Sequence, residues 1–172
     1  MNERLNLISG DEPLMLDPTD GQETLAQATD VFRYIDRNFE DWKCNRIGRA
    51  TKETQVQVYE MVWDATFQEM FSDFAAVIGH LTLTQAQIKQ FVRRYPDWLK
   101  KGGNGTGCVL PRAAACCWPI AFLRPESCRL SSGAFGLQHG LAATFSRTTP
   151  LRLVCSWGNY AVTGFLSAWC FP

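Results

Sequence analysis

The sequence predicts a mainly α-helical fold for residues 1–101, followed by an irregular region over residues 102–172 with at most short strands. Three observations lead to this prediction. Apolar residues recur at helical intervals in three segments of the first region. Capping residues and a proline mark the ends of those segments. Beyond residue 101 we find no sustained period of either the helical or the strand kind.

The first predicted helix spans residues 22–39. Asp20-Gly21-Gln22-Glu23 resembles a capping box, in which Asp20 would accept a hydrogen bond from a backbone amide of the first turn. Apolar residues then follow at intervals of three and four: Leu25, Ala28, Val31, Phe32, Ile35 and Phe39. Residues 1–19 show no period and contain two prolines, so we expect an irregular N-terminal segment.

The second predicted helix spans residues 54–75 and has the widest apolar stripe. The stripe consists of Val58, Tyr59, Val62, Phe67, Met70, Phe71 and Phe74. Acidic and amide residues occupy the positions between them, as in an amphipathic helix.

The third predicted helix spans residues 84–95. Thr84-Gln85-Ala86-Gln87 has the form of a capping box, and Pro96 ends the helix because proline disfavours helical backbone in the residue before it. Ile88, Phe91, Val92 and Tyr95 form the apolar face. We expect Trp98 and Leu99 to fold back onto the core.

Composition divides the chain near residue 102. Residues 1–101 hold 16 of the 17 acidic and 12 of the 17 basic residues, whereas residues 102–172 hold one acid, five arginines, no lysine and six of the seven cysteines. We therefore distinguish an irregular N-terminus (1–19), a small helical domain (20–101) and a cysteine-rich tail of aberrant composition (102–172). A typical soluble protein has about a quarter of its residues charged, far more than this tail.

The sequence offers no pattern typical of an enzyme or a cofactor site. The tail cysteines lack the C-x2-C pairs of zinc sites, and neither histidine has a partner that would orient it for catalysis. Gly102-Gly103-Asn104-Gly105-Thr106-Gly107 is not followed by the lysine of a phosphate-binding loop. We expect no catalytic residue, cofactor or metal.

One cluster of basic residues is a candidate nucleic-acid contact. Its members lie at the end of the third predicted helix: Lys89, Arg93, Arg94, Lys100 and Lys101. Attraction to phosphates dominates the affinity of proteins for nucleic acids. The acidic excess of residues 1–101 therefore disfavours nucleic-acid binding. A solvated helix end, or a protein-binding surface at the same place, is the alternative interpretation.

Two features bear on location. The N-terminus lacks a basic start followed by an apolar run, so it is not a signal peptide, and we expect a cytoplasmic protein. Residues 153–172 are uncharged and long enough to cross a bilayer, which makes a C-terminal membrane anchor an alternative. Several polar residues and a terminal proline in this segment disfavour it.

Residues 28–106 contain an ordered series of short stretches. They are Asp30-Val31-Phe32, Trp42-Lys43-Cys44-Asn45, Thr51-Lys52-Glu53-Thr54, Val58-Tyr59-Glu60-Met61-Val62, Asp64-Ala65-Thr66-Phe67, Leu83-Thr84-Gln85-Ala86-Gln87-Ile88, Phe91 and Trp98-Leu99. This series resembles a group of small bacterial proteins, chiefly from candidate-phylum genomes, that carries no assigned activity. The resemblance implies an α+β fold, with a strand beginning after Gly105-Thr106. This chain departs from the group at that point.

The departure suggests a change of reading frame. In the group a Phe-rich strand follows the Gly-Thr pair. The codons for Val109-Leu110-Pro111-Arg112 permit Phe-Phe-Leu when they are read one nucleotide out of frame. Together with the loss of lysine and aspartate, this leads us to hypothesise a frameshift near Thr106. The overall prediction is a small, soluble, non-enzymatic bacterial protein whose role and partners the sequence does not name.

Overall fold

In the part of the chain that it describes, the computed structural model has a large sheet with a helix packed on it. It describes residues 5–10, 14–35, 45–62, 65–66, 69, 71, 81–99, 106–110, 118–124, 129–135, 144–145 and 152–157. In chain order the elements are β1 (Leu5–Leu7), β2 (Leu14–Leu16), the 3-10 turn η1 (Leu25–Gln27), β3 (Tyr34–Ile35), β4 (Thr54–Met61), β5 (Ala65–Thr66), α3 (Gln85–Arg94), the 3-10 turn η4 (Pro96–Trp98), β6 (Thr106–Val109), β7 (Trp118–Arg124), β8 (Arg129–Phe135), β9 (Thr144–Phe145) and β10 (Arg152–Trp157).

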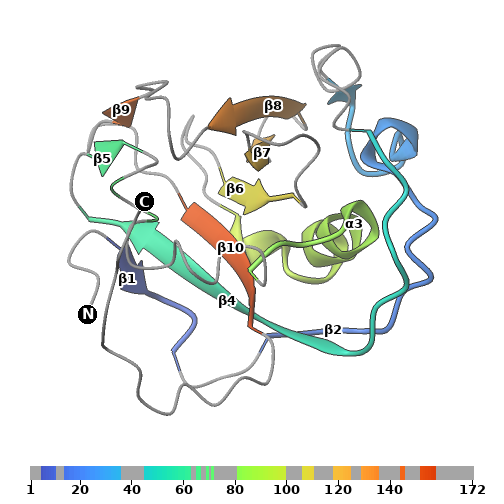
Figure 1. Ribbon diagram of the computed structural model, residues 1–172, viewed down its shortest axis with the longest axis horizontal. Helices are drawn as coiled ribbons and strands as arrows, with labels where there is room; N and C mark the ends of the chain where they lie inside the picture. Colours follow the sequence, from blue (N-terminus) through green and yellow to red (C-terminus); the bar gives the residue numbers. More distant parts are fainter. Residues whose placement is uncertain are drawn as a thin grey trace, which may run out of the picture.

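Among the described strands, eight form one mixed sheet. Their order is β1-β4-β10-β6-β7-β8-β3, and β2 pairs with β4 beyond the end of β1 (Figure 1). The pairs β10–β6 and β3–β8 are parallel, and the other pairs in this sheet are antiparallel. Strands β5 and β9 make a separate antiparallel pair. Because a helix packs on this mixed sheet, the fold is α+β.

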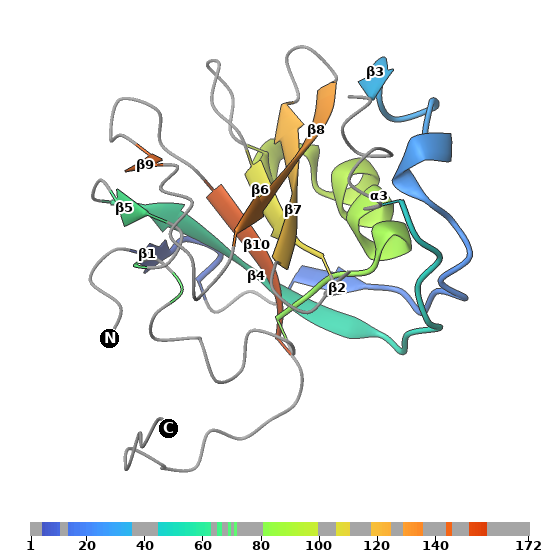
Figure 2. The same cartoon turned by 45° about the horizontal axis from the view of Figure 1, so that its top comes forward.

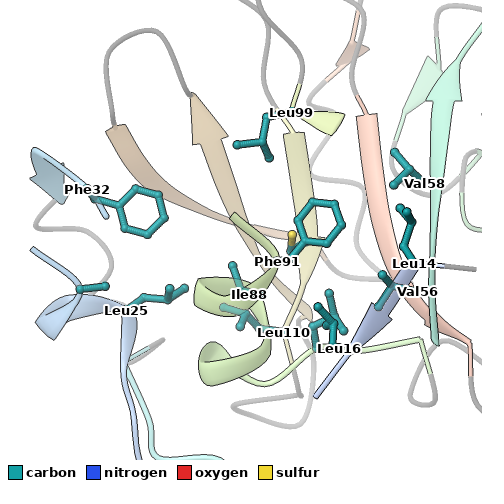
Figure 3. Packing of buried hydrophobic residues seen from close by; sticks show 13 residues of the cluster. Leu14, Leu16, Leu25, Phe32, Val56, Val58, Ile88, Phe91, Leu99 and Leu110 are labelled. Atoms are coloured by element: carbon teal, nitrogen blue, oxygen red, sulfur yellow. The ribbon is translucent and has the colours of Figure 1, made fainter. Parts of the chain in front are cut away.

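The core lies between α3 and the sheet. Figure 2 shows α3 beside the sheet, and Ile88 and Phe91 of α3 are fully buried and meet apolar residues of β2, β4 and β6 (Figure 3). The cluster comprises Leu14, Leu16, Leu25, Ala28, Phe32, Val56, Val58, Leu83, Ile88, Phe91, Leu99, Cys108 and Leu110. The core thus joins residues from both sides of the compositional break near residue 102.

The prediction of a mainly α-helical fold is wrong, most clearly over residues 54–75. The described residues there form the eight-residue strand β4 and the short strand β5. Gln55-Val56-Gln57-Val58 alternates polar and apolar residues, and both valines are fully buried. β-branched residues favour strands, and β4 has strand partners along both of its edges. Within 67–75 the structure describes Glu69 and Phe71, both in helical conformation.

The predicted helix over residues 22–39 is also wrong. The described part contains the single turn η1 and strand β3, and residues 36–39 lie outside the described residues. Asp20 Oδ1 accepts a hydrogen bond from the N–H of Gln22 (2.9 Å), which closes a local turn instead of starting a helix. The side chain of Thr24, which precedes η1, makes no capping bond.

The third predicted helix is confirmed as α3. Thr84 and Gln87 form the predicted capping box, and α3 ends at Arg94 before Pro96. Leu99 is buried in the core cluster and Trp98 packs against it, as expected.

The prediction that residues 102–172 are irregular with at most short strands is wrong where the structure describes them, because β7 and β8 each have seven residues. They contribute β6 to β10, and β10 lies between β4 and β6 (Figure 1). The partners of β10 lie more than 40 residues away in the sequence. Strand formation depends on packing against such distant partners, which residues 102–172 do not show by their own sequence.

Candidate interaction surface

Two side chains at the N-terminus of α3, those of Thr84 and Gln87, bond its backbone amides. The N–H of Gln87 donates to Thr84 Oγ1 (3.3 Å), and the N–H of Thr84 donates to Gln87 Oε1 (3.0 Å). Gln87 Nε2 also donates to Thr54 Oγ1 at the start of β4 (3.0 Å). The capping box therefore fixes the start of α3 and ties it to the sheet.

Gln85 joins α3 to two other segments. Its Oε1 accepts a hydrogen bond from the N–H of Leu25 (2.7 Å), and its Nε2 donates to the carbonyl oxygen of Arg46 (2.7 Å). Gln85 is buried, and a buried amide is stable only when such partners satisfy it. Sequence reasoning missed this role, because a glutamine within a capping box reads as part of the cap.

Gln85 is one of several anchors of an extended segment, residues 45–53. Thr51 and Thr19 exchange both backbone hydrogen bonds (2.8 and 3.1 Å), and the N–H of Gly48 donates to the carbonyl oxygen of Gly21 (2.9 Å). At its start, Asn45 Oδ1 accepts from the N–H of Ala26 (3.3 Å). In Figures 1 and 2 the segment runs beside the chain that leads from β2 to η1.

The same segment carries exposed side chains. Ile47 is 62% exposed, the most of the large apolar residues for which exposure is described. Arg46, Arg49 and Lys52 beside it are also exposed. Segment 45–53 therefore carries one large exposed apolar side chain and three exposed cations on a backbone that hydrogen bonds hold in place. These residues lie between the predicted helices 22–39 and 54–75, where the sequence indicates no function.

The basic residues singled out from the sequence meet carboxylates of the N-terminal segment. Lys89, whose side chain is 10% exposed, lies 2.9 Å from Glu23 and 3.6 Å from Asp30. Arg93 pairs with Asp30 as well. Their charges are thus opposed by two carboxylates, which lowers the positive potential this face can offer to phosphates.

Arg94 pairs with Asp17 and packs against an aromatic ring. Its Nη1 lies 2.9 Å from Asp17 Oδ1, and its guanidinium carbon lies 5.7 Å from the centre of the Tyr95 ring. The hydrogen bond to Asp17 and the neighbouring Tyr95 raise the pKa of Arg94 above its ordinary value. A raised pKa stabilises the fold below the ordinary pKa of arginine and loses that effect as pH rises through the raised value, in strongly alkaline solution.

The remaining predicted features fall partly outside the described residues. This holds for Lys100 and Lys101, for residues 102–105 of the glycine-rich run and for every tail cysteine except Cys108 and Cys155. In the part of the chain that is described, no group of three or more potential metal ligands comes together.

The proposed membrane segment, residues 153–172, begins within a strand. Residues 153–157 belong to β10, and residues 158–172 lie outside the described residues. None of the described helices is long and apolar enough to cross a membrane.

The described residues define an α+β protein with a tethered, partly apolar surface segment. No family model, curated protein or solved structure matches this sequence.

Proposed function

We propose that this chain is a non-enzymatic binding module that contacts another protein through segment 45–53. The observation that carries the proposal is the combination of a fixed backbone with an exposed Ile47. A surface held in place before binding loses less conformational entropy when a partner docks.

The charges of the segment indicate the chemistry of the partner. Along the segment the exposed cations Arg46, Arg49 and Lys52 outnumber the exposed acid Glu53, and Ile47 directly follows Arg46. An acidic protein surface with an apolar depression complements this arrangement, because opposite charges steer the encounter and the isoleucine supplies apolar contact area.

The proposed contact surface is segment 45–53 and not the basic end of α3. Lys89, Arg93 and Arg94 are engaged with carboxylates, which supports a role in holding α3 to the N-terminal segment. Nucleic-acid contact by these residues stays a prediction. Salt-sensitive retention on DNA that is lost in an Arg93→Ala, Arg94→Ala variant would support it.

Site-specific crosslinking tests the proposal. A photo-reactive amino acid replaces Ile47 in the full chain, or the exposed Leu7 on β1 as a control. In the host cell, position 47 should give an adduct of defined mass that position 7 does not give. The same adduct should weaken when Arg46→Glu and Arg49→Glu are added. Equal crosslinking at the two positions would contradict the proposal.

A further inference from the structure

One hydroxyl group satisfies both outward-facing backbone groups of a strand. Tyr95 Oη accepts a hydrogen bond from the N–H of Met15 in β2 (2.9 Å) and donates to the carbonyl oxygen of the same residue (2.9 Å). A tyrosine hydroxyl can do both because it is at once a donor and an acceptor.

Within β2, the backbone N–H and carbonyl groups of Met15 face the edge that does not pair with β4. Among the described strands β2 pairs with β4, with Leu14 opposite Val56 and Leu16 opposite Thr54. Backbone groups of successive residues in a strand point to opposite edges, so those of Met15 point away from β4. An uncovered strand edge is a template for pairing with another chain.

Several contacts hold Tyr95 over this edge. Its N–H donates to the carbonyl oxygen of Phe91 (2.8 Å), and the two rings lie 5.6 Å apart. Gln90 and Arg94 precede Tyr95 on α3. Both donate hydrogen bonds to the carboxylate of Asp17, the residue just after β2. The last turn of α3 is thus fastened along residues 15–17.

We propose that the Tyr95 side chain covers the outer edge of β2 and prevents its pairing with another strand. Removing this side chain would open the edge to antiparallel pairing with β2 of a second copy of this chain. The geometry favours a second copy for a specific reason. In an antiparallel pair, two residues directly opposite each other can exchange both backbone hydrogen bonds. Two Met15 residues related by a two-fold axis would therefore replace the two bonds that each now makes with Tyr95.

The experiment measures oligomeric state by light scattering on a sizing column, over a range of concentrations of the full chain. The wild type should be a monomer. Tyr95→Ala, which removes both the ring and the hydroxyl, should form a dimer as concentration rises. Tyr34→Phe, which removes the hydroxyl of an exposed tyrosine, serves as the matched control and should stay a monomer.

A second substitution shows whether the dimer forms through β2. Met15→Pro deletes the outward N–H and is tolerated at a strand edge whose N–H does not serve the sheet. Adding it to Tyr95→Ala should restore the monomer.

Three results would overturn the proposal: a wild type that is already dimeric, a folded Tyr95→Ala protein that stays monomeric, and a dimer that persists with Met15→Pro. If Tyr95→Ala does not fold, Tyr95→Leu, which also lacks the ring and the hydroxyl, takes its place, and its folded monomer overturns the proposal equally.

Discussion

At Gly21 the chain before η1 lies close against the backbone of segment 45–53. Its backbone has φ +76°, and a Cβ atom added there would overlap the carbonyl of Arg49. Gly10 has a similar φ of +59°, but a Cβ atom there would meet nothing within 4 Å. The two glycines therefore separate the cost of the backbone conformation from the cost of the close approach.

We predict that Gly21→Ala destabilises the protein more than Gly10→Ala does. The left-handed conformation alone costs about 1–2 kcal/mol for a residue with a Cβ atom, so Gly10→Ala should lose that much. Gly21→Ala should lose more, because the Arg49 backbone must also move. Urea unfolding of both variants measures the difference, and equal losses would show that the two segments do not touch as described.

Gln85 supports a second prediction at this scale. Gln85→Leu leaves the N–H of Leu25 and the carbonyl of Arg46 without their partner. Each of the two unsatisfied groups costs about 1–3 kcal/mol, so the free energy of unfolding should fall by about 2–6 kcal/mol.

Gln27→Leu on the exposed part of η1 is the control for Gln85→Leu and should change stability little. Chemical denaturation of both variants makes the comparison. A loss in Gln85→Leu no larger than that of the control would contradict the bridging role.

At the scale of elements, α3 is the part that the sequence predicts correctly. Its cap, apolar face and stop lie within residues 84–96, so local chemistry is sufficient to define it. We predict that Thr84→Ala lowers the free energy of unfolding by about 0.5–2 kcal/mol, the usual range for a lost N-cap. Thr84→Ser keeps the hydroxyl and should retain most of the stability; equal losses in thermal unfolding would argue against capping.

The other two predicted helices fail because their apolar spacing fits more than one structure. Val58, Tyr59 and Val62 fit a helical stripe, yet Val56 and Val58 also fit the alternation of a strand. Pairing with β10 and β1, which lie far away in the sequence, makes this segment a strand instead of a helix. In the first segment, the apolar positions Leu25, Ala28 and Phe32 do enter the core as expected, but through turns.

The candidate surface was even less accessible from sequence. Ile47 and its neighbours show no motif, and their position depends on backbone partners in residues 19–26 and on Gln85. The basic residues of α3 were identifiable as a group, but their carboxylate partners, more than 50 residues earlier, were not. A cluster of charges seen in the sequence does not reveal which distant residues neutralise it in the fold.

At the scale of the whole molecule, the sheet joins the two regions that composition separates. Strand β6 begins at Thr106, just after the compositional break, and Cys108 and Leu110 enter the core. Residues on both sides of the compositional break therefore contribute to one core.

The frameshift hypothesis concerns the same junction and makes a separate prediction. The gene should encode, in the plus-one frame from about Thr106, a charged segment with strand alternation and its own early stop. Resequencing of the nucleotides from codon 95 onward gives the answer. A shifted frame interrupted by many stops would refute the hypothesis and leave the cysteine-rich tail as the native sequence.

The most direct test of the α+β account is a disulfide between β4 and β10. Gln57 lies opposite Cys155 in the antiparallel register. Cα atoms of opposed antiparallel residues lie about 4.5–5.5 Å apart, within the range that a disulfide spans. The Gln57→Cys variant, oxidised mildly and mapped by mass spectrometry, should link position 57 to Cys155. The link should vanish when Cys155→Ser is added. If position 57 stays reduced, or pairs equally with other cysteines, then β10 does not lie beside β4 and the sheet described here is wrong.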